Sequence, residues 1–184
     1  KSSRRQRQMC IRDRLKEDSF KNLDLEKNKF SKKVNLVFET DLELMFPNNY
    51  INSSTERLKL YTQLNKICEL DELNSFKLEL TDRFGALPNV VVELLNSLEL
   101  RWIAGSLGFD KIVLKKNILI SYIMNFNSDE QKKKLDKLFD YSNLNANSIS
   151  FSQKRLADGD RFIVKIKNID SVSKAIKVLE DINT

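Results

Sequence analysis

The hydrophobic period of the chain changes near residue 110, and this change limits the folds that the chain can adopt. Before it, apolar side chains recur every three or four residues in three successive stretches, over 53–68, 71–84 and 88–107. That spacing predicts three amphipathic helices. After it, a two-residue alternation predicts short strands. We therefore predict an α+β protein, with a three-helix N-terminal half followed by a ββαββα half with an antiparallel sheet.

The strands of the second half are predicted to form two hairpins. The first joins "KIVLKK" to "ILISYI" at Lys116-Asn117, and the second joins "SISFSQKR" to "DRFIVKIK" at Asp158-Gly159, which is a common turn pair. A helix is expected from Ser128, with Leu135, Leu138 and Phe139 inward, and a last helix from Asp170. Further strand-like segments are "VNLVF" and the alternating Leu42 and Leu44. Cys68 is expected to be a small core residue.

The second predicted helix carries the most informative charged residues. Its inward stripe is Leu73, Phe76, Leu80 and Phe84, after which Gly85 can end the helix and Pro88 can start the next. Helical geometry then turns Glu79, Asp82 and Arg83 away from the core. Arg83 can pair with Glu79 at i,i+4 or bind a carboxylate of a partner. A rigid turn with mixed charges is typical of polar protein–protein contacts, although it also occurs on plain helix surfaces.

The net charge of +6 comes from one end of the chain. Residues 1–16 contain seven basic side chains and one acidic side chain, and the other 168 residues contain 25 of each sign. The body is therefore not a basic domain overall, which argues against direct DNA contact. We expect residues 1–14 to be a non-native or disordered basic tip and residues 15–39 to be a linker arm.

The chain lacks the residues that several classes of catalytic and cofactor-binding site need. The chain has no histidine, which removes the commonest general base and metal ligand. Its four glycines form no phosphate-binding motif, and its two cysteines have no metal-ligand spacing. We therefore predict no catalytic residues, no cofactor and no metal. No apolar run approaches the roughly 20 residues that cross a bilayer, and we expect a reduced, cytoplasmic setting without membrane contact.

Two longer segments resemble a known family. They are "TDLELMFPNNYINSSTERLKLYTQLNKI" and "ELTDRFGALPNVVVELLNSLELRWIAGSLGFDKIVLKKN". Both resemble the C-terminal domain of the bacterial transcription-repair coupling factors, the Mfd family. The similarity extends from about Leu15 to the end of the chain and is densest between Thr40 and Asn117. The strongest features are "DLEL" before Pro47, "ERLKLY" on the first helix, and "LTDRFGALP". Residues 1–14 match nothing in the family.

The resemblance implies a non-catalytic regulatory domain over residues 40–184. In this family the domain docks on the UvrB-like module of the same protein, hides the surface that UvrA would bind, and restrains an ATP-driven DNA translocase that displaces stalled RNA polymerase. The family's contact charges match Glu79, Asp82 and Arg83, which we take as the partner-binding residues. The arm at 15–39 would come from the upstream motor.

Two other functions are compatible with the sequence. One is a nucleic-acid-binding accessory domain that uses the basic tip and Lys132-Lys133-Lys134. The other is a carboxylate-based hydrolase built on Glu79 and Asp82, which would need these side chains to line a cleft.

Overall fold

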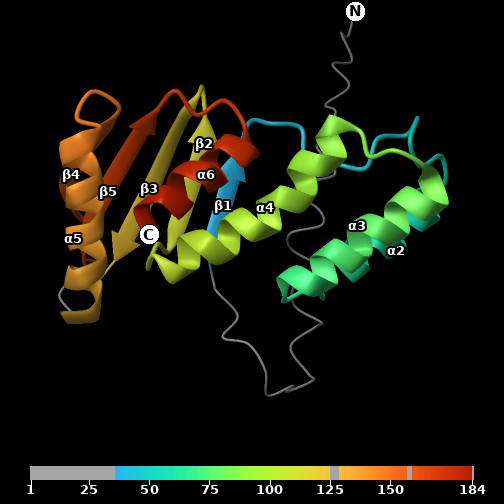
Figure 1. Ribbon diagram of the computed structural model, residues 1–184, viewed down its shortest axis with the longest axis horizontal. Helices are drawn as coiled ribbons and strands as arrows, with labels where there is room; N and C mark the ends of the chain where they lie inside the picture. Colours follow the sequence, from blue (N-terminus) through green and yellow to red (C-terminus); the bar gives the residue numbers. More distant parts are fainter. Residues whose placement is uncertain (1–35, 125–128, 157–158, 184) are drawn as a thin grey trace, which may run out of the picture. The chain divides into compact units, whose positions relative to one another are not determined.

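Three helices occupy the described part of the first half of the chain, as the apolar spacing predicts. The structure is a computed structural model that describes residues 36–124, 129–156 and 159–183. The helices are α2 (Ser54–Leu64), α3 (Leu70–Phe84) and α4 (Asn89–Ser106). All described residues belong to one compact unit, which extends from residue 33 to residue 184. Figure 1 shows how these elements follow one another.

The ends of these helices follow from specific residues. The side chain of Ser53 accepts a hydrogen bond from the backbone N–H of Glu56 and thereby caps α2. Gly85 ends α3 with a φ of 86° and a ψ of −164°, a conformation that is essentially restricted to glycine. Pro88 is the N-cap of α4, one position earlier than the first helical position expected for it.

The apolar faces of the three helices meet in one cluster, which we call the helical core. Its buried members from α2, α3 and α4 and from the preceding loop are Phe46, Ile51, Leu60, Leu64, Leu73, Phe76, Leu80, Val91, Leu94 and Leu95. Tyr61 fixes the loop to α2, because its hydroxyl accepts a hydrogen bond of 2.9 Å from the backbone N–H of Phe46. Through Leu73, Phe76 and Leu80, the helical core fixes which side of α3 faces inward.

A five-stranded sheet with the order β1-β2-β3-β5-β4 forms most of the second half. Its strands are β1 (Val37–Thr40), β2 (Lys111–Lys115), β3 (Ile118–Met124), β4 (Ile149–Leu156) and β5 (Gly159–Lys167). The remaining helices are α5 (Asp129–Leu144) and α6 (Val172–Asn183). The β2–β3 turn places Lys116 and Asn117 at φ values of 52° and 59°, as a tight hairpin requires.

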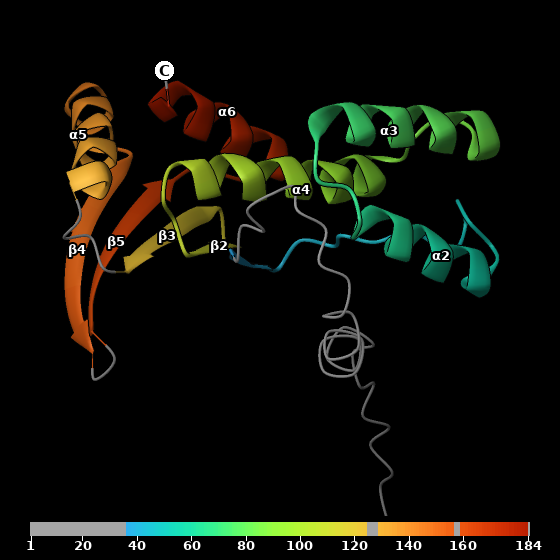
Figure 2. The same ribbon diagram turned by 90° about the horizontal axis from the view of Figure 1, so that it is seen from below.

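One face of the sheet is covered by helices. Side chains from α4, α5 and α6 form a second cluster, the sheet core, with Ile112, Leu119, Ile123, Val164 and Ile166 of the strands. Figure 2 shows α4 and α6 on the same side of the strands. Within the described part of the chain, no helix is both long and apolar enough to cross a membrane.

The α+β class is confirmed, but the prediction of an antiparallel sheet confined to the second half is only partly correct. The β2–β3, β3–β5 and β4–β5 pairs are antiparallel, whereas β1 pairs with β2 in parallel, with Val37 opposite Lys111. The sheet is therefore mixed and includes a strand from before the helices. This strand begins at Val37, so the sheet starts three residues before the expected domain boundary at residue 40.

Three smaller expectations were wrong. Cys68 is exposed, because α2 ends at Leu64 and the chain leaves the helical face before reaching it. Phe139 is 41% exposed, although its ring lies 5.0 Å from that of Phe151. The segment with Leu42 and Leu44 is irregular rather than a strand. The expected tip, most of the arm, Ser128 and Asp158 lie outside the described residues.

Candidate protein-docking site

The last turn of α3 carries the three residues that the sequence analysis selected. Leu73, Phe76 and Leu80 of this helix are buried in the helical core. Their burial forces the opposite side of the helix outward, and Glu79 and Asp82 are accordingly exposed. The Arg83 side chain is 39% exposed. The structure therefore brings the three residues together on one surface turn, and their role in binding a partner stays a prediction.

Arg83 joins two helices through two carboxylates. Its Nη1 donates to Oε1 of Glu79 at 2.8 Å within α3, and its Nη2 donates to Oε1 of Glu56 in the first turn of α2. The hydrogen bonds to Glu79 and Glu56 raise the pKa of Arg83 above its ordinary value. The guanidinium carbon also lies 4.9 Å from the centre of the Phe84 ring. Arg83 is thus held in position rather than extended freely into solvent.

Glu56 is the member of this site that sequence reasoning missed. Its spacing from Ser53 indicates a capping box, in which the glutamate side chain would return to the N–H of the capping residue. In the structure only the backbone half of that motif forms, since the Glu56 N–H donates to Ser53 Oγ at 3.3 Å. Its carboxylate instead binds Arg83. The capping pattern of Ser53 and Glu56 is visible in the sequence, but Arg83, which binds the Glu56 carboxylate, lies 27 residues further along the chain.

Asp82 differs from Glu79 and Glu56 because it makes no hydrogen bond or ion pair with another described residue. Asp82 directly precedes Arg83 in the chain and lies on the same exposed last turn of α3. The turn therefore presents one carboxylate free to accept hydrogen bonds and one guanidinium held in place. A partner with the opposite arrangement could satisfy both groups.

The corner after α3 is rigid for a second reason. The Tyr50 hydroxyl lies 3.2 Å from the carbonyl oxygen of Leu80 and 3.1 Å from that of Gly85, and can donate to either. The Gly85 N–H donates to the Thr81 carbonyl oxygen at 2.9 Å. Burial raises the pKa of Tyr50 above its ordinary value, which favours the protonated hydroxyl that donates these bonds. These bonds hold the end of α3 against the loop that precedes α2.

Exposed leucines flank the charged turn. Leu78 of α3 is 72% exposed and lies one helical turn before Asp82, and Leu58 of α2 is 54% exposed. Leu58 lines an open groove with Thr55, Glu56, Lys59, Thr62, Gln63 and Arg83. Charged groups beside solvent-exposed apolar side chains occur in protein–protein contacts and also on ordinary protein surfaces.

The carboxylate-based hydrolase and the nucleic-acid-binding domain that uses Lys132-Lys133-Lys134 find less support in the structure. Both Glu79 and Asp82 are exposed, and neither lines the groove beside Arg83, so this groove is not the cleft that a carboxylate hydrolase built on them would need. Within the described residues, no group of three or more acidic or cysteine side chains could hold a metal ion. In the Lys132-Lys133-Lys134 run, the first two side chains are exposed and Lys134 is half-buried, so the three do not form one exposed face.

Comparisons with known proteins identify the family. Residues 40–137 match the TRCF domain family. A transcription-repair-coupling factor from Helicobacter pylori is 29% identical over 123 residues, which are 66% of this chain and 12% of the relative. Another from Borreliella burgdorferi is 26% identical over 146 residues, which are 77% of this chain and 13% of the relative. The chain thus spans about an eighth of the length of these relatives.

A solved structure shares the fold. It is the crystal structure of the C-terminal domain of a transcription-repair coupling factor, with a TM-score of 0.58 and 14% sequence identity. The similarity covers 81% of this chain and 92% of that one. The matched family, the relatives and the shared fold agree, and the chain belongs to the TRCF-domain family of transcription-repair coupling factors.

Proposed function

We propose that this chain is a non-catalytic regulatory domain of a cytoplasmic transcription-repair coupling factor. Its docking surface is the last turn of α3 with the adjacent side of α2, defined by Glu56, Leu78, Glu79, Asp82 and Arg83. The docking partner is the UvrB-like module of the same protein. The single observation that carries this proposal is the fixed position of Arg83, which two carboxylates from different helices hold on the same helical turn as the unpaired Asp82.

Preorganisation is what makes such a turn suitable for docking. An arginine on a flexible surface loses side-chain entropy when a partner immobilises it. Arg83 is already held by Glu79 and Glu56, so less entropy remains to be lost. Asp82 then supplies a carboxylate that can form charge-assisted hydrogen bonds with an arginine of the partner. Leu78, one turn away, can bury apolar surface in the same contact.

Regulation follows from a two-state equilibrium. In the docked state the domain covers the surface of the UvrB-like module that UvrA would bind, and it restrains the ATP-driven translocase. In the released state that surface is free, and contacts with UvrA and RNA polymerase occur through the full-length protein. Shifting such an equilibrium from 1:99 to 99:1 takes about 5.5 kcal/mol, which a small polar interface can supply. Residues 15–39 would connect the domain to the motor.

A charge reversal tests the docking surface. In the variant Asp82→Arg with Arg83→Glu, the net charge is unchanged but both polar contacts become repulsive. We expect the Kd for the isolated UvrB-like module to rise about tenfold or more, equivalent to ~1.4 kcal/mol. Calorimetric titration of the full chain measures it.

The matched control is Asp136→Arg with Lys133→Glu, which makes the same exchange between two exposed residues of α5. This control should bind like the unchanged chain. Equal affinity for the α3 variant and the control would contradict the assignment of the site.

A further inference from the structure

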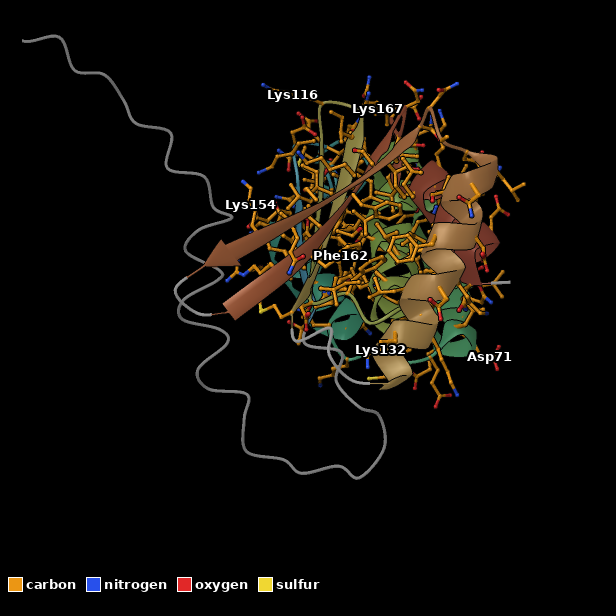
Figure 3. The ribbon with its side chains drawn as sticks, turned by 90° about the vertical axis from the view of Figure 1, so that its left-hand side faces the viewer. Asp71, Lys116, Lys132, Lys154, Phe162 and Lys167 are labelled. Carbon is orange, nitrogen blue, oxygen red and sulfur yellow. The ribbon has the colours of Figure 1, made fainter. Side chains whose placement is uncertain are left out.

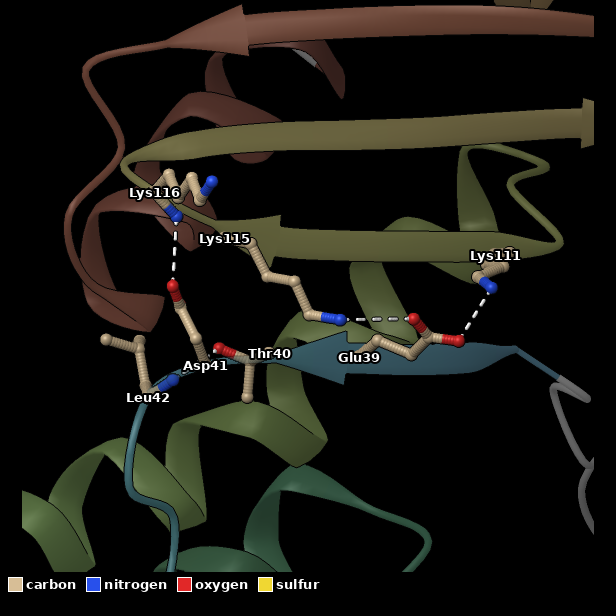
Figure 4. A network of polar contacts seen from close by, with 7 residues as sticks. All are labelled: Glu39, Thr40, Asp41, Leu42, Lys111, Lys115 and Lys116. Carbon is tan, nitrogen blue, oxygen red and sulfur yellow. Dashed lines mark hydrogen bonds and ion pairs between the residues drawn. The ribbon is translucent and has the colours of Figure 1, made fainter.

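The sheet has a second face that no described helix covers, and we call it the open face. Strand register assigns side chains to it, because alternate residues point to opposite sides of a sheet. Val164 and Leu119 belong to the sheet core, so their neighbours Lys165 and Ile120, which lie opposite each other, point to the other side. Figure 4 views the sheet from this side, with helices behind the strands.

Basic side chains outnumber acidic ones on the open face. It carries six of them on three strands, and they are Lys111 and Lys115 of β2, Lys154 of β4, and Arg161, Lys165 and Lys167 of β5. Figure 3 labels Lys154 and Lys167 on the strands. Among the strand residues whose side chains are described, Glu39 is the one carboxylate on this face. The face therefore has a strong excess of positive charge, although the chain outside its first 16 residues is neutral overall.

The carboxylate of Glu39 is already paired with two lysines of the neighbouring strand. Glu39 accepts a hydrogen bond of 2.6 Å from Lys111 Nζ and lies 3.5 Å from Lys115 Nζ (Figure 4). In contrast, Lys154, Lys165 and Lys167 have no ion pair with another described residue, and all three are exposed. Lys165 and Lys167 are two positions apart on one strand, which places them about 7 Å from each other on the same face. These ammonium groups are available to an external anion.

The centre of the open face is apolar and contains an aromatic ring. Tyr122 of β3 lies between Lys111 of β2 and Ile163 of β5 in the strand register, and it is half-buried. Val113, Ile120 and Ile163 lie near it on the same face, where Val113 and Ile163 are buried and Ile120 is half-buried. Exposed lysines around a half-buried aromatic ring suit a ligand with both phosphates and flat rings. A purely acidic peptide would use the lysines but not the ring.

We propose that the open face binds single-stranded nucleic acid, with Lys165, Lys167 and Lys154 contacting phosphates and Tyr122 stacking on a base. This function is separate from docking through α3 and does not depend on it. The contacts are to the backbone and to base faces, so binding should depend strongly on salt and weakly on sequence.

The test uses the full 184-residue chain and a fluorescently labelled single-stranded oligonucleotide of mixed sequence. Anisotropy titrations at several salt concentrations compare the variant Lys165→Glu with Lys167→Glu against the control Lys133→Glu with Lys177→Glu. Both control lysines are exposed on the helices α5 and α6. The two variants have the same net charge and the same basic N-terminal residues, so the contribution of those residues cancels.

We expect the sheet variant to lose about tenfold or more in affinity and its salt slope to fall by about 1.4, from roughly 0.7 for each lost phosphate contact. The control should stay within about twofold of the unchanged chain. The variant Tyr122→Leu should weaken binding about fivefold or more through lost stacking. The variant Lys165→Thr with Lys167→Thr keeps good strand formers, and it replaces the glutamate variant if that protein does not fold.

Three results would overturn the proposal. Equal losses in the sheet variant and the control would show that only overall charge matters. Unchanged affinity in the sheet variant would place binding elsewhere. Equally tight, lysine-dependent binding of a polyglutamate peptide, with no effect of Tyr122→Leu, would show that the open face takes an acidic protein segment instead.

Discussion

The helical half and the sheet half of this domain differ in how they use charge. Residues 52–106 contain six basic and eight acidic side chains, whereas residues 107–184 contain 14 basic and ten acidic ones. In the helical half, Arg83 is fixed by two carboxylates at one turn. In the sheet half, lysines spread over three strands, and several have no ion pair with a described residue. The zero net charge of residues 17–184 therefore conceals two surfaces of opposite character.

The arrangement of charges indicates which kind of partner each half can bind. Few charges in fixed positions favour a partner of defined shape, because geometry decides which carboxylate or guanidinium fits. Many exposed charges of one sign favour an extended polyanion, because each contact adds electrostatic attraction without demanding a particular sequence. The two surfaces rest on separate apolar clusters, the helical core and the sheet core.

The largest effect is expected inside the helical core. Leu80→Ala removes a fully buried side chain of α3 and should lower the free energy of unfolding by about 2–5 kcal/mol. The same change at Leu78, on the same helix but 72% exposed, should cost no more than about 0.5 kcal/mol. Urea unfolding measures both. Similar losses for the two variants would show that α3 is not oriented as described.

Two buried serines sharpen the comparison between the halves. Ser121 of β3 is completely buried, and its hydroxyl has no hydrogen-bond partner in the described part of the chain. Ser97 of α4 is also buried, but its hydroxyl donates to the Leu94 carbonyl oxygen at 2.6 Å. Because an unsatisfied buried hydroxyl is costly, Ser121→Ala should raise the free energy of unfolding by about 1 kcal/mol. Ser97→Ala should lower it by about 1 kcal/mol or less. Thermal unfolding that shifts in the same direction for both variants would contradict this account.

The smallest effect concerns the attachment of β1 to the sheet. The hydrogen bond from Lys111 and the charges of Lys111 and Lys115 lower the pKa of Glu39 below its ordinary value, although burial opposes this. A lowered folded-state pKa means that the contribution to stability is present above the unfolded-state pKa and is lost as the pH falls through the folded-state value. At pH 7, Glu39→Gln should lower the free energy of unfolding by less than about 1 kcal/mol, because the pair is partly exposed.

The pH dependence separates this interaction from a general charge effect. The difference between Glu39→Gln and the unchanged chain should disappear in acid, where Glu39 is protonated in both states. Glu43→Gln alters an exposed carboxylate that has no ion pair with a described residue, and it should change stability by no more than about 0.5 kcal/mol. A Glu39 difference that persists unchanged at low pH would show that the ion pair with Lys111 is not its source.

Local patterns in the sequence predicted most of the fold. Apolar spacing located α3 and its outward turn, and alternation located β2, β3, β4 and β5. These signals are local because each element buries one face. The parallel pairing of β1 with β2 was not predictable in this way, since four residues from Val37 to Thr40 pair with a strand about 70 residues later. A short segment contains no information about which distant edge it will join.

The candidate sites were predicted to different extents. Glu79, Asp82 and Arg83 were found because their outward direction follows from the inward stripe of the same helix. Glu56 was missed because its partner lies on another helix. The open face was missed because its lysines are dispersed over β2, β4 and β5, and only the strand register brings them to one side. The net charge of the whole chain does not show that basic side chains gather on one face of the sheet.

The most direct test of the account is a crossed titration with two variants and two ligands. The variants are Asp82→Arg with Arg83→Glu in α3 and Lys165→Glu with Lys167→Glu in β5, and the ligands are the isolated UvrB-like module and the labelled single strand. We predict that each variant loses about tenfold or more in affinity for one ligand only, the module for the α3 variant and the oligonucleotide for the β5 variant. Loss of both ligands in one variant, or loss of the opposite ligand, would contradict the separation of the two surfaces.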